Sequence, residues 1–333
     1  MRAVRVEAHG GPEALQHVEV EAPEPADGDV AVDVTHVGLN HLDVWVRRGV
    51  AGHAFPLPLI PGADIVGRRV DTGETVALFP ATSCMRCGAC LDGRHDLCRA
   101  YRIRGERTDG GLCERVVVPE WQLLPLGRLE PHEAAALPLA LLTAWHMLVG
   151  RAEVRPGQRV LVQAGAGGVA SLAIQVARHL GARVVATAST QEKRALCRRL
   201  GAEEAWSYDA LRAGVKAWSP GGVDLVVEHV GAATWAQSMR AVRWGGTVVT
   251  CGATAGHQVE LDLRALFFKQ LSLLGSTMGS WGELKDAWRA VQDGAIRPVL
   301  DGVWPVRDVQ EAYARLEERK AQGKVVVQVA DGW

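Results

Sequence analysis

The pattern of apolar and polar positions changes near residue 155, and this change divides the chain into two regions. Before it, short segments alternate or run apolar between glycines and prolines, as in residues 2–10, 29–38 and 112–120. This texture is typical of β-strands joined by turns. The first region is therefore predicted to be β-rich.

After residue 158 the chain alternates between short apolar runs and segments with helical spacing of apolar residues. The predicted strands are 159–165, 182–189, 223–231 and 247–253, and the predicted helices are 167–181, 190–201 and 234–246. Thr190 is the expected N-cap of the second helix and Gly201 its expected end. Such repetition predicts a parallel sheet with right-handed crossovers, so the fold class is α/β. Residues 282–330 add two further helices and a closing strand.

Composition agrees with a folded chain of two domains. The chain has 333 residues, 48% of them hydrophobic and 23% charged, which are ordinary globular values. The formal net charge of −1 provides no basic surface for nucleic acid, so a nucleic-acid partner is not expected.

No targeting or membrane segment is expected from the sequence. Residues 1–13 are polar from the start, which argues against a signal peptide. The longest apolar stretch, 133–150, is too short to span a bilayer and contains Pro138 and His146, so a buried helix is expected. Clustered cysteines without a secretory signal favour a reducing compartment, and a cytoplasmic location is predicted.

A glycine motif lies where the first strand of the α/β region turns into a helix. Gly165, Gly167 and Ala170 form G-x-G-x-x-A, which allows the backbone to approach a pyrophosphate at a helix N-terminus. We expect Gly165, Gly167, Gly168 and Val169 to contact a dinucleotide cofactor. The alternative is a tight structural turn without a ligand.

The end of the second strand bears on which dinucleotide binds. NAD sites usually place Asp or Glu there to bind the ribose 2′-OH, but this chain has Ala188 and Ser189, followed by Lys193 and Arg194. Without a carboxylate, and with cations nearby, a 2′-phosphate can be accommodated. We therefore expect NADP(H) rather than NAD(H), bound with Ser189 and Lys193. The alternative for the two cations is a solvated helix face.

Four of the seven cysteines form a cluster with metal-ligand spacing. Cys84, Cys87, Cys90 and Cys98 follow the pattern C-x2-C-x2-C-x7-C. Four thiolates with no open position form a closed site of the structural zinc type. One structural Zn²⁺ is predicted in a lobe of residues 84–98, with free or disulfide-linked cysteines as the alternative.

With these features the chain resembles the medium-chain dehydrogenase/reductase superfamily, the group of zinc alcohol dehydrogenases and quinone oxidoreductases. The resemblance is carried by residues 1–45, 137–148, 160–190, 270–279 and 317–329. It implies a GroES-like β-barrel catalytic domain from residues 1–128 and 277–333, and a Rossmann nucleotide-binding domain from residues 129–276. It also implies a small-molecule site between the domains, and a homodimer or tetramer formed through the Rossmann domains.

The chain departs from the zinc alcohol dehydrogenases at all three ligands of their catalytic metal. These positions fall on Asn40, Ala63 and Leu139, none of which suits Zn²⁺. Without a Lewis acid an alkoxide is poorly stabilised, whereas hydride addition to a quinone or an activated C=C bond needs less support.

The candidate catalytic residues are Asn40, Asp43 and Trp45. The zinc-free quinone oxidoreductases that this chain resembles carry Asn at the position of Asn40, and we expect its amide to orient substrate or nicotinamide; the alternative is an Asn that bonds its own turn. Trp45 is expected to shape the pocket. A substitute metal site of His41, Asp43 and Asp64 is a further alternative.

Resemblance also indicates four residues near the cofactor. Thr143 is expected at the nicotinamide, Tyr208 near the adenosine phosphate, and Arg319 and Lys324 near the cofactor phosphates. The resulting prediction is an NADPH-dependent reductase of quinones or activated C=C bonds. An NAD(P)-dependent alcohol dehydrogenase and a non-catalytic nucleotide-binding protein are the alternatives.

Overall fold

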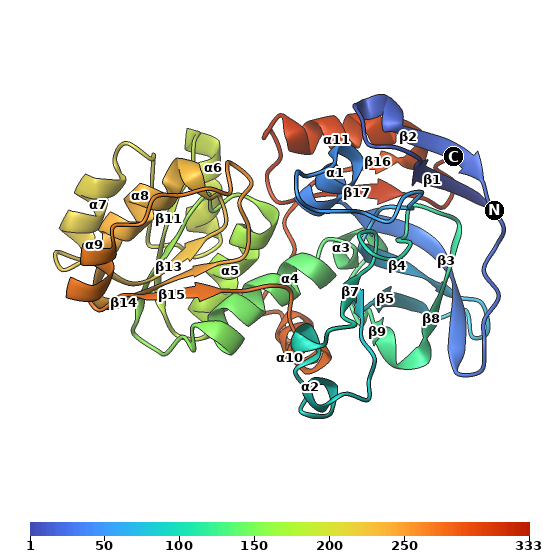
Figure 1. Cartoon of the computed structure of the whole chain (residues 1–333), viewed down its shortest axis with the longest axis horizontal. Coiled ribbons are helices and arrows are strands. Elements are labelled where there is room, and N and C mark those ends of the chain that lie inside the picture. The colour runs from blue at the N-terminus through green and yellow to red at the C-terminus, as the bar shows by residue number, and fades with distance from the viewer. The chain divides into compact units, whose positions relative to one another are not determined.

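The computed structural model describes all 333 residues and divides into two compact units. The first unit contains Met1–Ala140, Ser280–Lys285 and Pro298–Trp333, and the second contains Leu141–Gly279 and Asp286–Arg297. Both ends of the chain, blue and red in Figure 1, thus belong to the first unit. The predicted boundaries, after residues 128 and 276, fall shortly before these. Helix α3 (Pro131–Ala134) contacts strands β3 and β4 of the first unit, which places the segment after residue 128 with that unit.

The first unit is built on a curved sheet whose strands follow the order β16-β17-β3-β4-β5-β9, with β8 also paired to β3. The bounds are β3 Asp29–Gly38, β4 Asp64–Arg69, β5 Thr75–Leu78, β8 Arg115–Pro119, β9 Leu123–Pro125, β16 Leu300–Pro305 and β17 Lys324–Gln328. β17 pairs antiparallel with β3, with Val326 opposite Gly38. This register brings the C-terminal strand beside the residues that follow β3.

Smaller elements complete the first unit. They are β1 Arg2–Val6, β2 Leu15–Glu19, β6 Ala81–Thr82, β7 Arg102–Ile103, α1 His41–Arg48, α2 Gly88–Leu91 and α11 Val309–Glu317, with 3₁₀ turns at Pro12–Ala14, His95–Leu97, Glu120–Gln122 and Val306–Asp308. Alternate residues of β3, such as Val30, Val32 and Val34, point into one buried cluster with Ile65 of β4. The period-two pattern in the sequence therefore corresponds to the core-facing side of the strand.

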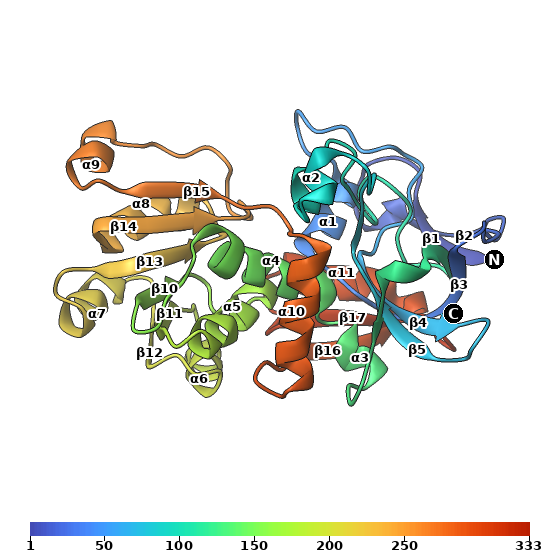
Figure 2. The same ribbon diagram turned by 90° about the horizontal axis from the view of Figure 1, so that it is seen from below.

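The second unit contains a six-stranded parallel sheet in the order β12-β11-β10-β13-β14-β15, which Figure 2 shows running from β15 to β12. The bounds are β10 Arg159–Val162, β11 Arg183–Thr187, β12 Glu204–Trp206, β13 Val223–Glu228, β14 Val242–Thr250 and β15 Ser272–Gly275. The strand order reverses between β10 and β13, which is the switch point where such sheets bind ligands. The predicted α/β class, a GroES-like domain with a Rossmann domain, is confirmed.

Helices connect the strands of this sheet, and two further helices, α4 and α10, are divided between the two units. Their bounds are α4 Pro138–Trp145, α5 Gly168–His179, α6 Gln191–Arg199, α7 Leu211–Trp218, α8 Ala232–Ala241, α9 Leu263–Phe268 and α10 Trp281–Gln292, with a π-helical turn at His146–Arg151. α5 contacts β10 and β11, and α6 contacts β11 and β12. The predicted N-cap is confirmed, since Thr190 Oγ1 accepts a hydrogen bond from Lys193 N at 3.2 Å.

Two predictions of local structure are wrong, and some elements were not predicted. The helix predicted over 234–246 ends at Ala241, because Val242 already pairs with Val223 of β13 and pairing between strands overrides the helical pattern. The buried helix predicted over 133–150 is divided into α3, α4 and the π-helical turn, with a break before Pro138. Strand β16 and helix α9 were not predicted.

No helix in the chain is long and apolar enough to cross a membrane.

Candidate functional site

The first unit holds a buried ammonium group where β17 meets the end of β3. Lys324 Nζ donates to Leu39 O at 2.8 Å, to Asn40 Oδ1 at 2.5 Å and to Asp64 Oδ2 at 2.8 Å. Lys324 is only 3% exposed and Asp64 is fully buried. The three protons of the ammonium thus have three acceptors within the protein. The prediction that Lys324 reaches cofactor phosphates is therefore wrong.

The side-chain amide of Asn40 is held between the two charges of this pair. Its Nδ2 donates to Asp64 Oδ2 at 2.9 Å and makes a longer contact of 3.4 Å with Gly38 O. The other oxygen of Asp64 accepts a hydrogen bond from Leu139 N at 2.5 Å. Asn40 therefore presents its oxygen to the ammonium and its nitrogen to the carboxylate, which fixes the orientation of the amide.

Asp43 lies in the first turn of α1, three residues after Asn40, which is the N-cap of this helix. Its Oδ2 accepts from Asn40 N at 2.7 Å and its Oδ1 accepts from Gly62 N at 2.8 Å. Complete burial raises the pKa of Asp43 to about 6, although both backbone bonds and the charge of Lys324 act against that shift. The carboxylate thus joins the start of α1 to the loop before β4.

Asp43 makes a pH-dependent contribution to stability. Its pKa is raised from 3.8 to about 6 on folding, so its contribution is fully present below pH 3.8 and is lost as pH rises through about 6. The loss amounts to about 3 kcal/mol. We expect the unfolding free energy of the wild type to fall by about this amount relative to Asp43→Asn between pH 4 and pH 7. Urea unfolding of both proteins across this range measures the difference, and a pH-independent difference would contradict the assignment.

The catalytic metal positions of the zinc enzymes do not form a metal site here. Ala63 is fully buried and Leu139 offers only its backbone N–H to Asp64. His41 is not part of any cluster of potential metal ligands, and the oxygens of Asp43 and Asp64 are already bonded to N–H groups. The donor set does not fit a divalent metal, so the substitute site of His41, Asp43 and Asp64 is not formed.

The two remaining candidates of the first unit lie in different surroundings. Trp45, on α1, is half-buried and packs on the apolar cluster of Val46, Phe55 and Leu59. Arg319 is exposed just beyond the end of α11, with a positive φ of 56°. The structure therefore brings Asn40, Asp43 and Trp45 together on the first turns of α1. Their catalytic roles, and the cofactor role of Arg319, stay predictions.

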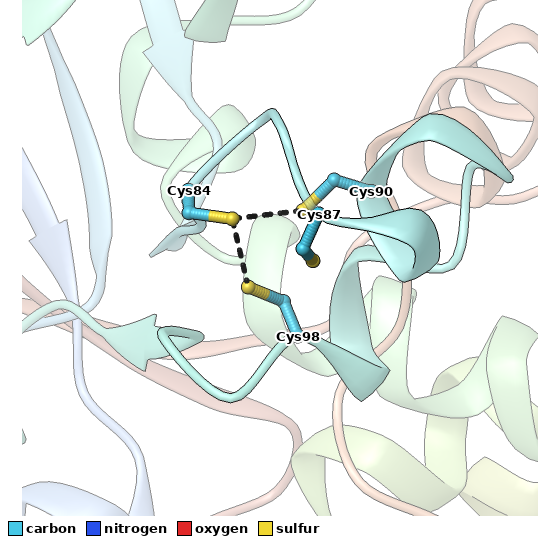
Figure 3. A group of neighbouring side chains, drawn as sticks. All are labelled: Cys84, Cys87, Cys90 and Cys98. Carbon is cyan, nitrogen blue, oxygen red and sulfur yellow. Dashed lines mark hydrogen bonds between the residues drawn. The ribbon is translucent and has the colours of Figure 1, made fainter.

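The cysteine cluster of the first unit fits a tetrahedral metal. Figure 3 shows the side chains of Cys84, Cys87, Cys90 and Cys98 directed toward one another, and their sulfur atoms all lie within 4.8 Å. The distance from Cys84 Sγ is 3.9 Å to Cys90 Sγ and 3.5 Å to Cys98 Sγ. Zinc–sulfur bonds of about 2.3 Å in a tetrahedron place sulfurs about 3.8 Å apart. Zn²⁺ is therefore a suitable occupant of this site.

The backbone of the lobe favours thiolates. N–H groups of Arg86 and Cys87 lower the pKa of Cys84 to about 6, since they donate to its sulfur. Ala100 N donates to Cys98 Sγ at 3.3 Å. Backbone donors thus offset part of the negative charge that four thiolates bring to one metal ion.

The glycine loop of the second unit connects β10 to α5. A Cβ atom at Gly165 would lie 2.8 Å from Cys197 Sγ and 2.9 Å from Ala186 Cβ, so this glycine is required by packing. A Cβ at Gly167, by contrast, would meet no protein atom closer than 3.5 Å. The absence of a side chain at Gly167 leaves space at the N-terminus of α5, which suits a phosphate. Sequence reasoning missed Cys197, which supports the loop from α6.

A buried polar network supports the same loop from below. Thr187 Oγ1, at the end of β11, accepts from Ala164 N at 3.0 Å and donates to Gln163 Oε1 at 2.6 Å. Gln163 Nε2 donates to Ser238 Oγ at 3.0 Å, and Ser238 Oγ donates to Glu228 Oε2 at 2.6 Å. The bond from Ala164 is important because this residue has a positive φ of 49°. None of these four polar side chains was recognised from the sequence.

Replacement of Thr187 by valine is expected to weaken dinucleotide binding without changing the fold. The change removes one hydrogen bond that holds Ala164, at a cost of about 1 kcal/mol, which corresponds to about fivefold in Kd. Fluorescence titration with NADPH measures the change. Thr250→Val is the matched control, since the hydroxyl of Thr250, at the end of β14, bonds Gly252 O instead. Equal affinity of the Thr187→Val variant and the wild type would exclude this role.

Arg194 places a cation beside the end of β11. Its Nη1 donates to the carbonyl oxygens of Ala188 at 3.3 Å and of Ser189 at 3.1 Å, and Ser189 itself is exposed. Lys193 contributes its backbone N–H to the N-cap of α6. The guanidinium of Arg194 was noted in the sequence, but only the structure shows that it folds back onto the strand end.

The last two predicted residues of the second unit lie on different elements. Thr143, on α4, is buried and its Oγ1 contacts Met278 Sδ at 3.9 Å. Tyr208 is half-buried in the turn after β12. The positions of Thr143 beside the nicotinamide and of Tyr208 beside the adenosine phosphate stay predictions.

Comparison with known proteins gives consistent matches along the chain. Residues 26–128 match the alcohol dehydrogenase GroES-like domain and residues 168–293 match the zinc-binding dehydrogenase domain. A probable quinone oxidoreductase of Schizosaccharomyces pombe is 29% identical over 97% of this chain and 96% of its own length. A crotonyl-CoA reductase of Streptomyces avermitilis is 31% identical over 93% of this chain and 80% of its own length.

Solved structures of dehydrogenases and reductases also match this chain along nearly its whole length. The structure of an NAD-dependent alcohol dehydrogenase superposes with a TM-score of 0.94 at 42% identity, covering 99% of this chain and 100% of the other. A crotonyl-CoA carboxylase/reductase, AntE, in complex with NADP superposes with a TM-score of 0.87 at 27% identity, covering 98% and 94%.

Proposed function

The chain belongs to the medium-chain dehydrogenase/reductase superfamily and is an NAD(P)-dependent oxidoreductase; from this premise we propose that it reduces quinones or activated C=C bonds with NADPH. The relatives named as quinone oxidoreductase and crotonyl-CoA reductase support both acceptor classes. The activated bond would be conjugated to a carbonyl group, as in an enone or an enoyl thioester.

The observation that carries this proposal is the buried cluster of Asn40, Asp64 and Lys324. An ammonium, a carboxylate and an amide occupy the region in which the zinc alcohol dehydrogenases hold their catalytic metal. Oxidation of an alcohol would here lack a Lewis acid for the alkoxide. An enone or a quinone carries the developing charge on its own carbonyl oxygen, and hydrogen-bond donors are sufficient to stabilise it.

Each residue of the cluster has a separate task in this proposal. Bound NADPH supplies the hydride. Asn40 orients the substrate carbonyl through Nδ2, because its 3.4 Å contact with Gly38 O is long and can be exchanged for a substrate oxygen. Lys324 and Asp64 hold the amide in this orientation, Asp43 fixes the backbone N–H of Asn40, and Trp45 shapes the adjoining surface.

Three observations support NADP(H) and one favours NAD(H). Ser189 stands exposed at the end of β11 where NAD sites carry a carboxylate, and the guanidinium of Arg194 donates to the carbonyl oxygen of Ser189. The AntE structure contains NADP, whereas the alcohol dehydrogenase at 42% identity is described as NAD-dependent. The cation of Arg194 and the absence of a carboxylate outweigh the overall similarity to the NAD-dependent alcohol dehydrogenase. The group on the ribose 2′ position is recognised by side chains at the end of β11 and not by the fold as a whole.

Replacement of Arg194 by glutamine is expected to raise the Kd for NADPH about tenfold and to leave the Kd for NADH nearly unchanged. The lost interaction is a charge-assisted hydrogen bond that only the 2′-phosphate can make. Titration of both cofactors measures the ratio. Arg198→Gln, on the same helix but bonded to Ala205 O, is the control. Equal losses for both cofactors would exclude a role in discrimination.

The proposed function is tested by NADPH and NADH oxidation against quinones, enones, enoyl-CoA thioesters and aldehydes, with metal analysis of the same sample. We expect turnover of quinones or conjugated acceptors, and one zinc ion per chain held by the four cysteines. Turnover of aldehydes with two zinc ions would instead support the alcohol dehydrogenase alternative, which the NAD-dependent relative favours. Cofactor binding without any turnover would support the non-catalytic alternative.

The second unit supports a homodimer as part of this proposal. β15 is the last strand of its sheet, so its outer edge has no strand partner. Leu263, Phe267 and Phe268 of α9 are more than half exposed. An open strand edge and exposed aromatic side chains are features that a second copy of the chain can cover.

None of the seven cysteines forms a disulfide bond, which is compatible with a cytoplasmic location.

A further inference from the structure

The second unit carries a cavity whose charge the proposed reductase activity does not require. It has a volume of about 490 Å³, within the size range of ligand pockets. Arg178 and His179 of α5, Arg199 of α6 and Arg297 after α10 line it, and no carboxylate does. None of the three arginines forms an ion pair. Three guanidinium groups therefore face one space without a counter-ion, in a chain with a net charge of −1.

The structure holds two of these arginines in place. The side chain of Gln175, which is buried, donates to Arg297 O at 2.9 Å and accepts from Arg297 N at 2.9 Å, so it attaches this segment to α5 at two points. The side chain of Arg178 lies over Gly201, where a Cβ atom would come within 2.7 Å of its Nη1. These contacts position the backbone of Arg297 and the side chain of Arg178 at the cavity, which lowers the entropy lost when an anion binds.

The cavity is separate from the dinucleotide loop. Gly167 and Gly168 lie at the N-terminus of α5, whereas Arg178 lies in its last turn, about 15 Å further along the helix axis. Arginines near helix C-terminal ends also interact favourably with the helix dipole. That interaction accounts for Arg178 and Arg199 individually, but it does not account for Arg297 or for the open space that all three share.

We propose that this cavity binds a small anion with two or more negative charges, of the pyrophosphate type, at a site distinct from the dinucleotide site. Guanidinium groups bind phosphate oxygens through paired charge-assisted hydrogen bonds, and three of them match a multiply charged anion. A cavity of this size, open to solvent and lined by exposed guanidinium groups, suits a phosphorylated metabolite better than the extended backbone of a nucleic acid.

The test is calorimetric titration of the full-length protein with sodium pyrophosphate at constant ionic strength, with and without saturating NADPH. We expect pyrophosphate binding to persist at saturating NADPH, because NADPH occupies the glycine loop and the end of β11 and leaves this cavity free. Arg178→Gln/Arg199→Gln/Arg297→Gln is expected to weaken pyrophosphate binding at least about tenfold. Arg128→Gln/Arg212→Gln/Arg240→Gln, which removes the same charge elsewhere, is expected to bind as the wild type does. Arg199→Gln alone is used if the triple variant does not fold.

Four results would overturn the proposal. Pyrophosphate that binds only without NADPH would be bound at the glycine loop. An equal loss in both triple variants would indicate a general charge effect. Tighter binding of a single-stranded oligonucleotide than of pyrophosphate would indicate a nucleic-acid surface. If the arginines only stabilise helix ends, their replacement will lower the melting temperature and leave pyrophosphate binding unchanged.

Discussion

Removal of the zinc ion proposed for the four cysteines, or replacement of Cys90 by serine, is expected to unfold the lobe of residues 84–98. The lobe has little else to hold it: α2 comprises four residues, and Leu91 and Leu97 are 75% and 59% exposed. Four-thiolate zinc sites contribute on the order of 10 kcal/mol of folding free energy, and this contribution is lost when the metal or a ligand is removed. We expect this to be the largest effect of any single change discussed for this protein.

Limited proteolysis with mass spectrometry locates the new cleavage sites, and metal analysis of the same sample counts the zinc. A second readout is tryptophan fluorescence, because Trp281 N bonds His95 Nδ1 at the base of the lobe and the indole packs on Phe79 and Trp121. Cys251→Ser, in the second unit, is the matched control and should retain zinc. A lobe that resists protease after complete zinc removal would show that the protein contacts are sufficient.

Replacement of Lys324 by methionine is expected to destabilise the protein by about 3–5 kcal/mol. It leaves the carboxylate of Asp64 buried without its charge partner, which costs far more than the loss of an exposed pair. Lys320 provides the matched control, since it pairs with Glu318 at the surface of the same unit, and Lys320→Met should cost less than about 1 kcal/mol. Urea unfolding measures both free energies.

The double variant Lys324→Met/Asp64→Asn separates charge from packing. It removes both charges, while an asparagine oxygen can still accept the hydrogen bond from Leu139 N. We expect it to regain most of the stability lost by Lys324→Met, with a coupling energy of several kcal/mol between the two positions. A double variant no more stable than Lys324→Met would show that shape at this site matters more than charge.

Much of the fold could be predicted because its signals are local. The apolar runs of β10, β11 and β13 and the N-cap at Thr190 each depend on neighbours within one turn or one strand. The segment over 242–246 was mistaken for helix because its pairing partner, β13, lies elsewhere in the chain. β16 escaped notice for the same reason, since its strand conformation depends on pairing with β17.

The same difference between local and distant contacts explains which residues of the candidate site could be predicted from the sequence. Asn40 was identified through its position in a motif, but its bonds to Lys324 and Asp64 could not be foreseen. Arg194 was visible beside Ser189, yet a helical arginine points to solvent more often than onto a strand end. Glu228 and Ser238 gave no signal at all, because a buried polar network has no periodicity in sequence.

By itself the sequence determined the thiolate cluster and the glycine loop, because close spacing along the chain already places their groups together. Only the tertiary structure decided that Lys324 neutralises Asp64, from which it is separated by 260 positions. The antiparallel register of β17 on β3 brings these two groups into contact, and burial makes their pairing obligatory, since neither charge is stable there alone.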